Sequence, residues 1–239
     1  MDRTERHLRA GLVLYAAGEF HAAHEPWERR WLELADAGGD DGGTADPTDA
    51  DGSEGRPDDA TASPDPPDRR LLQGLIQTTA AVYHARTGND EGANGLAGSA
   101  RGYLGGLAPT YRGVALDPVL AFLERVAADP AVVEREGAVA IELDGEVLRA
   151  TTASFETVVL AAEALVEEDV LDGETVAAAA EYGRADLADG RATSPFVSLL
   201  ADLVDGENRA LVERRLGEHV DRRDHREAGV AGLFDVDDR

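Results

Sequence analysis

The spacing of apolar residues along the chain predicts a protein built almost entirely of helices. Leu8, Leu12 and Tyr15 recur at helical intervals within residues 4–17, and Gly18 follows as a residue suited to a left-handed helix cap. The same periodicity, with Asp117-Pro118 as a helix start, predicts further helices over residues 69–87, 90–107, 117–126, 155–168, 173–188, 195–204 and 207–226. The fold class expected is all-α, arranged as a helical bundle.

One short segment breaks the helical period. Val139, Ile141 and Leu143 alternate with their neighbours, and Asp144-Gly145 then supplies a tight turn. The segment therefore predicts one short β-hairpin within residues 138–149.

Residues 19–35 hold the densest group of chemically capable side chains. At helical spacing, one stripe carries Phe20, His24, Trp27, Trp31 and Leu34, and a second carries His21, Glu25, Glu28 and Leu32. Pro26 is awkward inside a helix, because it lacks an N–H and clashes with the preceding turn. Either the helix kinks there, or it starts late with Pro26 in its first turn.

The helix predicted over residues 69–87 has a broad apolar face and a second, polar one. The apolar face is formed by Leu71, Leu72, Leu75, Ile76, Thr79, Val82 and Tyr83. Gln73, Gln77 and His84 lie close together on the polar face, and Gly88-Asn89 ends the helix.

Residues 38–68 have a different composition, rich in acids, proline and glycine and without large apolar residues. Such a segment cannot bury apolar area and is expected to be a disordered acidic insertion. The predicted organisation is a helical domain from residues 1–37 and 69–152, the insertion at 38–68, and a C-terminal helical region over 153–239.

The charge is strongly acidic: 48 acidic residues face 23 basic ones, for a net charge of -25. Every basic residue is arginine, a balance typical of proteins from salt-accumulating halophiles, where screening permits many surface carboxylates. The charge argues against a nucleic-acid partner, which needs clustered basic residues. Cysteine is absent, and neither a signal peptide nor an apolar membrane span is present, so a soluble, cytoplasmic protein is expected.

The candidate site combines both polar segments and has two interpretations. Its residues are His24, Glu25, Trp27, Glu28, Trp31, Gln73, Gln77 and His84. One interpretation is a structural network, in which Glu28, Gln77 or His84 satisfies a buried His24. The other is a small-molecule or divalent-metal site, with His21, His24 and Glu28 as metal ligands, although the spacing is not that of an HExxH motif.

With both segments considered together, residues 8–126 resemble the family called domain of unknown function 309. The resemblance rests on Phe20, His24, Glu25, Glu28 and Trp31, followed by Leu72-Gln73-Gly74-Leu75-Ile76-Gln77, His84 and Gly88-Asn89. It implies a small helical bundle in which the two segments pack face to face. Residues 155–239 look like an extension found in halophilic archaeal members. The resemblance implies no activity.

The sequence leaves two hypotheses for the function, and it does not decide whether the protein is an enzyme. The favoured hypothesis is a helical interaction module, which binds a peptide or forms a homo-oligomer around a structural polar cluster. The alternative is a small-molecule or metal site, with hydrolysis as one reaction, centred on His24, Glu28 and His84.

Overall fold

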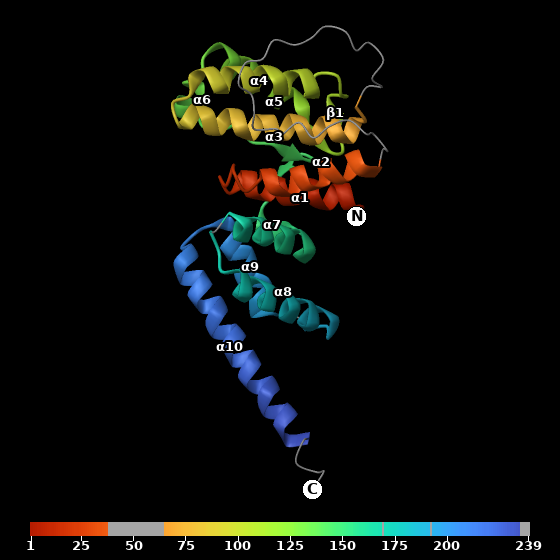
Figure 1. The fold of residues 1–239 in the computed structure, drawn as a ribbon, viewed down its shortest axis with the longest axis vertical. Coiled ribbons are helices and arrows are strands. Elements are labelled where there is room, and N and C mark those ends of the chain that lie inside the picture. The colour runs from red at the N-terminus through yellow and green to blue at the C-terminus, as the bar shows by residue number, and fades with distance from the viewer. Residues whose placement is uncertain (38–64, 169, 192, 235–239) are drawn as a thin grey trace.

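The computed structural model describes residues 1–37, 65–168, 170–191 and 193–234 (Figure 1). The helices of the first part are α1 (Arg3–Ala16), α2 (His24–Ala37), α3 (Pro67–Arg86), α4 (Asp90–Leu104), α5 (Leu116–Ala128) and α6 (Val132–Glu136). After a short 3-10 turn (Ala150–Thr152) come α7 (Phe155–Glu167), α8 (Gly173–Ala188), α9 (Pro195–Asp205) and α10 (Arg209–Phe234). The predicted all-α class is confirmed. Most of the predicted acidic insertion, residues 38–64, lies outside the described residues.

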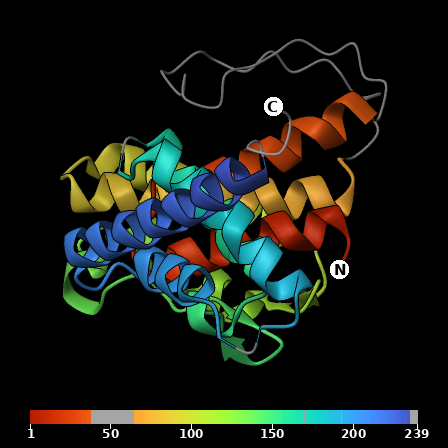
Figure 2. The same cartoon turned by 90° about the horizontal axis from the view of Figure 1, so that it is seen from below.

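The helices are stacked in layers along the long axis of the molecule (Figure 1). At one end α4 packs between α3 and α5; α3 in turn contacts α2, and α2 contacts α1. Helix α1 packs on α7. Helices α7, α8 and α9 pack on one another, and α10 packs along α8 and α9. Seen from below, α10 lies in front of the other helices (Figure 2).

Buried apolar side chains form one cluster that runs from α1 to α10. The division into two helical regions near residue 152 stays a prediction. Within the described part of the chain, no helix combines the length and apolarity needed to cross a bilayer.

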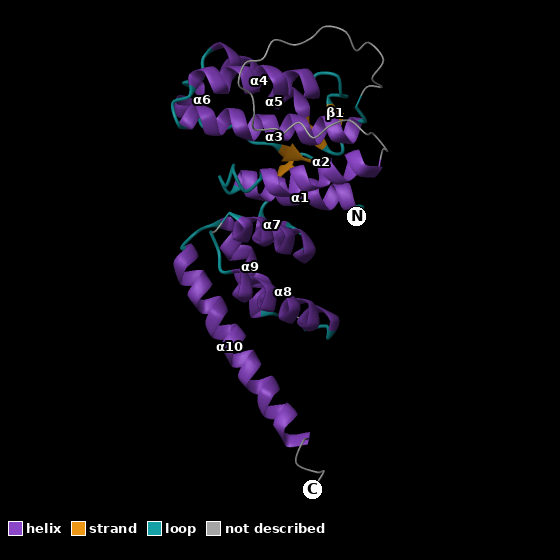
Figure 3. Ribbon diagram, viewed as in Figure 1, coloured by secondary structure: helices purple, strands orange, loops and turns teal. Residues whose placement is uncertain are grey.

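Two hairpins form a four-stranded antiparallel sheet, where the sequence predicted one hairpin (Figure 3). Strands β3 (Glu142–Leu143) and β4 (Glu146–Val147) flank the predicted Asp144-Gly145 turn. The second hairpin joins β1 (Thr110–Tyr111) and β2 (Val114–Ala115), and Val114 pairs with Leu143 across the sheet.

The turn of the unpredicted hairpin is Arg112-Gly113, and both residues have a positive φ. Arginine is not a usual residue there, so the sequence gives no hairpin signal. Its guanidinium donates hydrogen bonds to both carboxylate oxygens of Asp68 and to Asp2. These charge-assisted bonds hold Arg112 in the left-handed conformation and attach the hairpin to α3 and to the N-terminus.

Helix boundaries differ from the predicted ones where proline or capping decides them. Helix α2 starts late, at His24, so Pro26 lies in its first turn, where no backbone hydrogen bond is lost. Helix α3 begins at Pro67, two residues before the predicted start, with proline at the first helical position. Helix α5 begins at Leu116, so Asp117 lies in the first turn instead of capping it.

The position of α2 on α1 is fixed by a tryptophan that sits over a glycine. Trp27 is fully buried, and its Nε1–H donates to the Leu8 carbonyl at 3.1 Å. A Cβ atom at Gly11 would collide with the indole ring, so only glycine allows this approach. A further tie joins the same helices, because His7 Nδ1 donates to the Pro26 carbonyl at 2.8 Å.

Replacing Gly11 by alanine should therefore destabilise the protein. Overpacking of a well-filled core costs about 1–3 kcal/mol, and we expect Gly11→Ala to lower the free energy of unfolding by that amount in chemical denaturation. The matched control is Gly98→Ala in α4, where a Cβ atom meets nothing within 4 Å. That change should raise the free energy of unfolding by roughly 0.5–1 kcal/mol, because alanine has a higher helix propensity than glycine. Equal stability of the two variants would contradict this account of the packing.

Candidate functional site

The end of α3 and the start of α4 are joined by a tight cap. Gly88 has φ +76°, its N–H donates to the Ala85 carbonyl, and the Asn89 N–H donates to the His84 carbonyl at 2.9 Å. These are the two bonds of a Schellman motif, which needs a left-handed residue at this position. The motif brings Asn89 next to His84.

Asn89 holds His84 with one end of its amide and caps α4 with the other. Its Oδ1 accepts from the Gly92 N–H at 3.0 Å, and its Nδ2 lies 2.8 Å from His84 Nδ1. Because the amide nitrogen must donate, His84 Nδ1 is the acceptor and the proton of the neutral ring is on Nε2. Gly92 permits this arrangement, since a Cβ atom there would lie 2.7 Å from the Asn89 amide nitrogen.

His24 reaches from α2 to the backbone of α3. Its Nε2 lies 2.9 Å from the Ile76 carbonyl, which can only accept, so Nε2 carries the proton and Nδ1 keeps its lone pair. Burial lowers the pKa of His24 to about 4, and the bond to Ile76 opposes this shift only in part. The ring is therefore neutral near pH 7. The predicted partners Glu28, Gln77 and His84 do not satisfy Nε2; a backbone carbonyl does.

Both histidines open onto one cavity of about 780 Å³ between the start of α2, α3 and α4. Of the predicted site residues, the structure brings together His21, His24, Glu28, Gln77 and His84 in its wall. The remaining lining residues are Phe20, Ile76, Thr79, Ala80, Tyr83, Asn89, Glu91, Gly92, Gly95, Leu96 and Ser99. His21 is the most open of the three histidines, with 62% of its side chain exposed.

The other predicted site residues serve the packing around the cavity. Trp27 is buried against α1, and Trp31 carries the guanidinium of Arg69 at 4.5 Å from its ring centroid. Gln73 is buried in α3 and does not line the cavity. Glu25 faces α7.

Two lining residues are not identifiable as site residues from the sequence pattern. Tyr83, predicted on the apolar face of α3, is 47% exposed because it lines the cavity, while the adjacent Val82 is fully buried in the core. Asn89 is predicted only as the end of α3. Its position before Asp90 and Glu91, a typical helix start with acids in the first turn, is the available signal.

An acidic cluster lies beside the cavity, where α2 meets α7. Burial, a hydrogen bond with Glu167 and the charges of Glu167, Glu28 and Glu168 together raise the pKa of Glu25 to about 7. Arg29 pairs with Glu167, and His21 Nδ1 lies 2.5 Å from Glu168 Oε2. Glu25 therefore loses its proton only near neutral pH, and below that pH it shares the proton with Glu167.

A metal at His21, His24 and Glu28 stays a prediction. Within the described ranges, no three histidine, aspartate or glutamate side chains form a group suited to hold a metal ion. His24 would have only Nδ1 left as a ligand, because Nε2 is bonded to Ile76.

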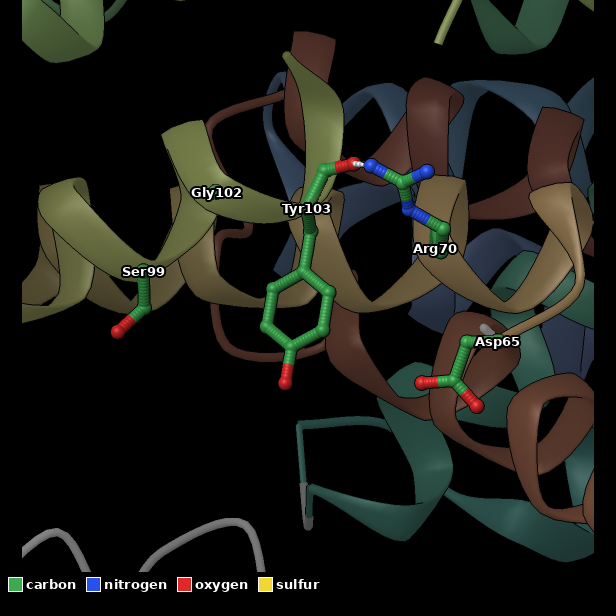
Figure 4. A pocket seen from close by; sticks show the side chains of 5 residues that line it. All are labelled: Asp65, Arg70, Ser99, Gly102 and Tyr103. Atoms are coloured by element: carbon green, nitrogen blue, oxygen red, sulfur yellow. Dashed lines mark hydrogen bonds between the residues drawn. The ribbon is translucent and has the colours of Figure 1, made fainter. Parts of the chain in front are cut away.

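A second, smaller hollow of about 400 Å³ lies beyond Ser99, a residue that lines both (Figure 4). The guanidinium of Arg70 in this hollow donates a hydrogen bond of 3.0 Å to the Tyr103 carbonyl. Its wall has five residues, Asp65, Arg70, Ser99, Gly102 and Tyr103, and no histidine. The larger cavity is therefore the stronger candidate site.

The family model described as Domain of unknown function (DUF309) matches residues 61–96. The match confirms the predicted resemblance and covers Gln73, Gln77 and His84, while the His24 segment precedes it. A comparison with the curated proteins finds no significant match. The halophilic archaeal source and the C-terminal extension of the family stay predictions.

Asn89→Ala should both destabilise α4 and release His84. Loss of a helix cap costs about 0.5–2 kcal/mol, measurable by chemical denaturation. The ¹⁵N chemical shifts of the imidazole should show one tautomer of His84 in the parent protein and a mixture in the variant. Asn89→Asp is the control, because it keeps an oxygen for Gly92 but cannot donate to His84. It should retain the stability and still change the tautomer; an unchanged tautomer in both variants would disprove the bridge.

Glu25 should make stability fall with rising pH. Its pKa in the folded protein is about 7, against an ordinary value of 4.5 for a glutamate carboxyl, so the folded state retains a proton that the unfolded chain releases. The stabilisation that this proton gives the folded state is fully present below pH 4.5 and is lost between pH 4.5 and about 7. Above that range Glu25 no longer changes the stability with pH. Glu25→Gln should flatten this slope.

The size of the effect is moderate because Glu25 is only partly buried, so solvent screens part of the pKa shift. We expect Glu25→Gln to raise the free energy of unfolding by on the order of 1 kcal/mol at pH 8, measured by urea denaturation. Glu124→Gln on α5, where the carboxylate is exposed, should leave the profile unchanged. A parallel pH profile for Glu25→Gln and the parent protein would show that no proton is held there.

Proposed function

We propose that the cavity between α2, α3 and α4 binds a small organic molecule. The observation that carries this proposal is the convergence of His24, Glu28, Gln77 and His84, from segments far apart in the sequence, on one space of about 780 Å³. Small-molecule sites have volumes of about 300–1,000 Å³ and combine apolar walls with a few polar groups. Phe20, Ile76 and Leu96 supply apolar wall here.

The polar groups are oriented before a ligand arrives. The bond to Ile76 assigns a lone pair to His24 Nδ1, and the bond to Asn89 assigns a donor to His84 Nε2. A ligand can thus meet one imidazole acceptor and one imidazole donor at little cost in conformational entropy. The same acceptor is a candidate general base, which keeps hydrolysis as a finer hypothesis within this proposal.

The interaction-module hypothesis has less support from the geometry. A purely structural network needs no space between its members, whereas His24, Gln77 and His84 line a cavity of about 780 Å³. That the protein has no nucleic-acid partner and that it lies in the cytoplasm remain predictions from charge and composition. A homo-oligomer remains a prediction of the interaction-module hypothesis.

Two glycines of α4 allow a matched test by filling the cavity. Gly95 lines the cavity and Gly98 does not, and a Cβ atom at either position meets nothing within 4 Å. A panel of small polar fragments is screened by thermal shift and ligand-observed NMR against the parent protein, Gly95→Leu and Gly98→Leu. We expect fragments that bind the parent and Gly98→Leu to lose at least about tenfold in affinity for Gly95→Leu.

Both variants gain helix propensity equally, so their stabilities serve as an internal check. A panel without binders, or binders that Gly95→Leu retains, would overturn the proposed function.

A further inference from the structure

Four aromatic rings line the cavity in a continuous row. The ring centroids are 6.0 Å apart for His21 and His24, 6.1 Å for His21 and Tyr83, and 5.9 Å for Tyr83 and His84. The face of a phenol ring such as that of Tyr83 carries negative electrostatic potential and attracts a cation within about 6 Å. The row is therefore an aromatic wall on one side of the cavity, and Tyr83 is its electron-rich ring.

The charged residues among the described cavity lining are carboxylates. These are Glu28 and Glu91, and no arginine is part of that lining. Burial keeps His24 neutral near pH 7, since its pKa is about 4. A proton on His21 would be matched by Glu168, whose Oε2 lies 2.5 Å from Nδ1. The net charge of -25 adds a negative field around the whole protein.

One cation already occupies an aromatic ring at the edge of the site. Arg86 lies 4.5 Å from the ring centroid of Phe20, a lining residue, without lining the cavity itself. This contact shows that the local aromatic surface accommodates a delocalised cation. Tyr83 is the lining phenol ring left to a ligand.

The helix ends around the cavity also disfavour an anion. The start of α4 would attract one, but its Gly92 N–H is bonded to the Asn89 side chain and its Ala93 N–H to the Asn89 carbonyl, both at 3.0 Å. At the start of α2, the His24 N–H is bonded to the His21 carbonyl. Tyr83 and His84 lie in the last turn of α3, where the helix dipole is negative.

We propose that the ligand of this cavity is a small organic cation with an alkylated nitrogen, bound against the Tyr83 ring and balanced by Glu91. This inference rests on the proposed function of the cavity as a small-molecule site. An alkylated nitrogen fits better than an inorganic ion, because aromatic rings and apolar wall solvate alkyl groups and supply no tight ligand cage.

Three probes of the same shape and different charge test the inference. They are choline (cation), 3,3-dimethylbutan-1-ol (neutral) and 3,3-dimethylbutanoate (anion), each titrated into the full chain by calorimetry or NMR at constant ionic strength. We expect choline to bind about tenfold more tightly than the neutral alcohol, and the anion to bind most weakly.

Two variants assign the effect to the cavity wall. Tyr83→Leu removes one ring at an exposed position, and Glu91→Gln removes one carboxylate from the first turn of α4. Each should weaken choline binding about three- to tenfold and leave the neutral alcohol nearly unchanged. Glu124→Gln, outside the cavity, should change neither, and circular dichroism checks that all variants fold.

The possible failures are distinguishable from one another. If the alcohol or the anion binds as tightly as choline, and Gly95→Leu abolishes that binding, the cavity is a site but the cation inference is wrong. If none of the three probes binds while fragments do, the cation inference is again wrong and the proposed function stands. If neither probes nor fragments bind, both are overturned.

Discussion

The position of the Trp27 indole over Gly11 is the constraint on which the site depends. Helix α2 has no freedom to rotate or slide on α1, because a ring of this size has space only where α1 has no side chain. With that contact set, the other faces of α2 receive their partners. His24 meets the backbone of α3, and Glu25 meets the end of α7. One apolar contact thus determines where the polar groups lie.

The polar groups around the cavity are held mainly by backbone atoms and by one amide. A carbonyl cannot change its role as acceptor, so the ring of His24 is oriented more firmly than a carboxylate or a second imidazole would orient it. The protonated pair of Glu25 and Glu167 lies just outside the wall, at the contact between α2 and α7. It lets two acidic side chains approach one another in a protein whose carboxylates otherwise repel.

The sequence predicts the regular parts of this architecture well, since each depends on local spacing. The helical periods, the left-handed cap at Gly18 and the Asp144-Gly145 turn were all readable. The Arg112-Gly113 turn was not, because its stability comes from Asp2 and Asp68, far away in the chain. The packing of Trp27 against Gly11 likewise cannot be inferred from either segment alone, because the two residues lie on different helices.

The sequence indicates which residue types meet around His24 better than how each is bonded. It predicts Glu28, Gln77 or His84 as the partner of a buried His24, and it predicts no partner for His84. The actual partners are a main-chain carbonyl and Asn89, which carry no compositional signal of that role. Tyr83 is expected in the core, because the apolar stripe of α3 is broader than the face that the core covers. Val82 is buried there, and Tyr83 lines the cavity.

The double role of Asn89 links the order of a helix end to the chemistry of the cavity. When the first turn of α4 frays, the Asn89 amide loses Gly92, and His84 then loses the partner that fixes its proton on Nε2. Conversely, any ligand that accepts from His84 Nε2 favours the folded turn. Occupancy and helix fraying are therefore thermodynamically coupled, so hydrogen exchange at the Gly92 amide reports on binding without a change in the overall fold.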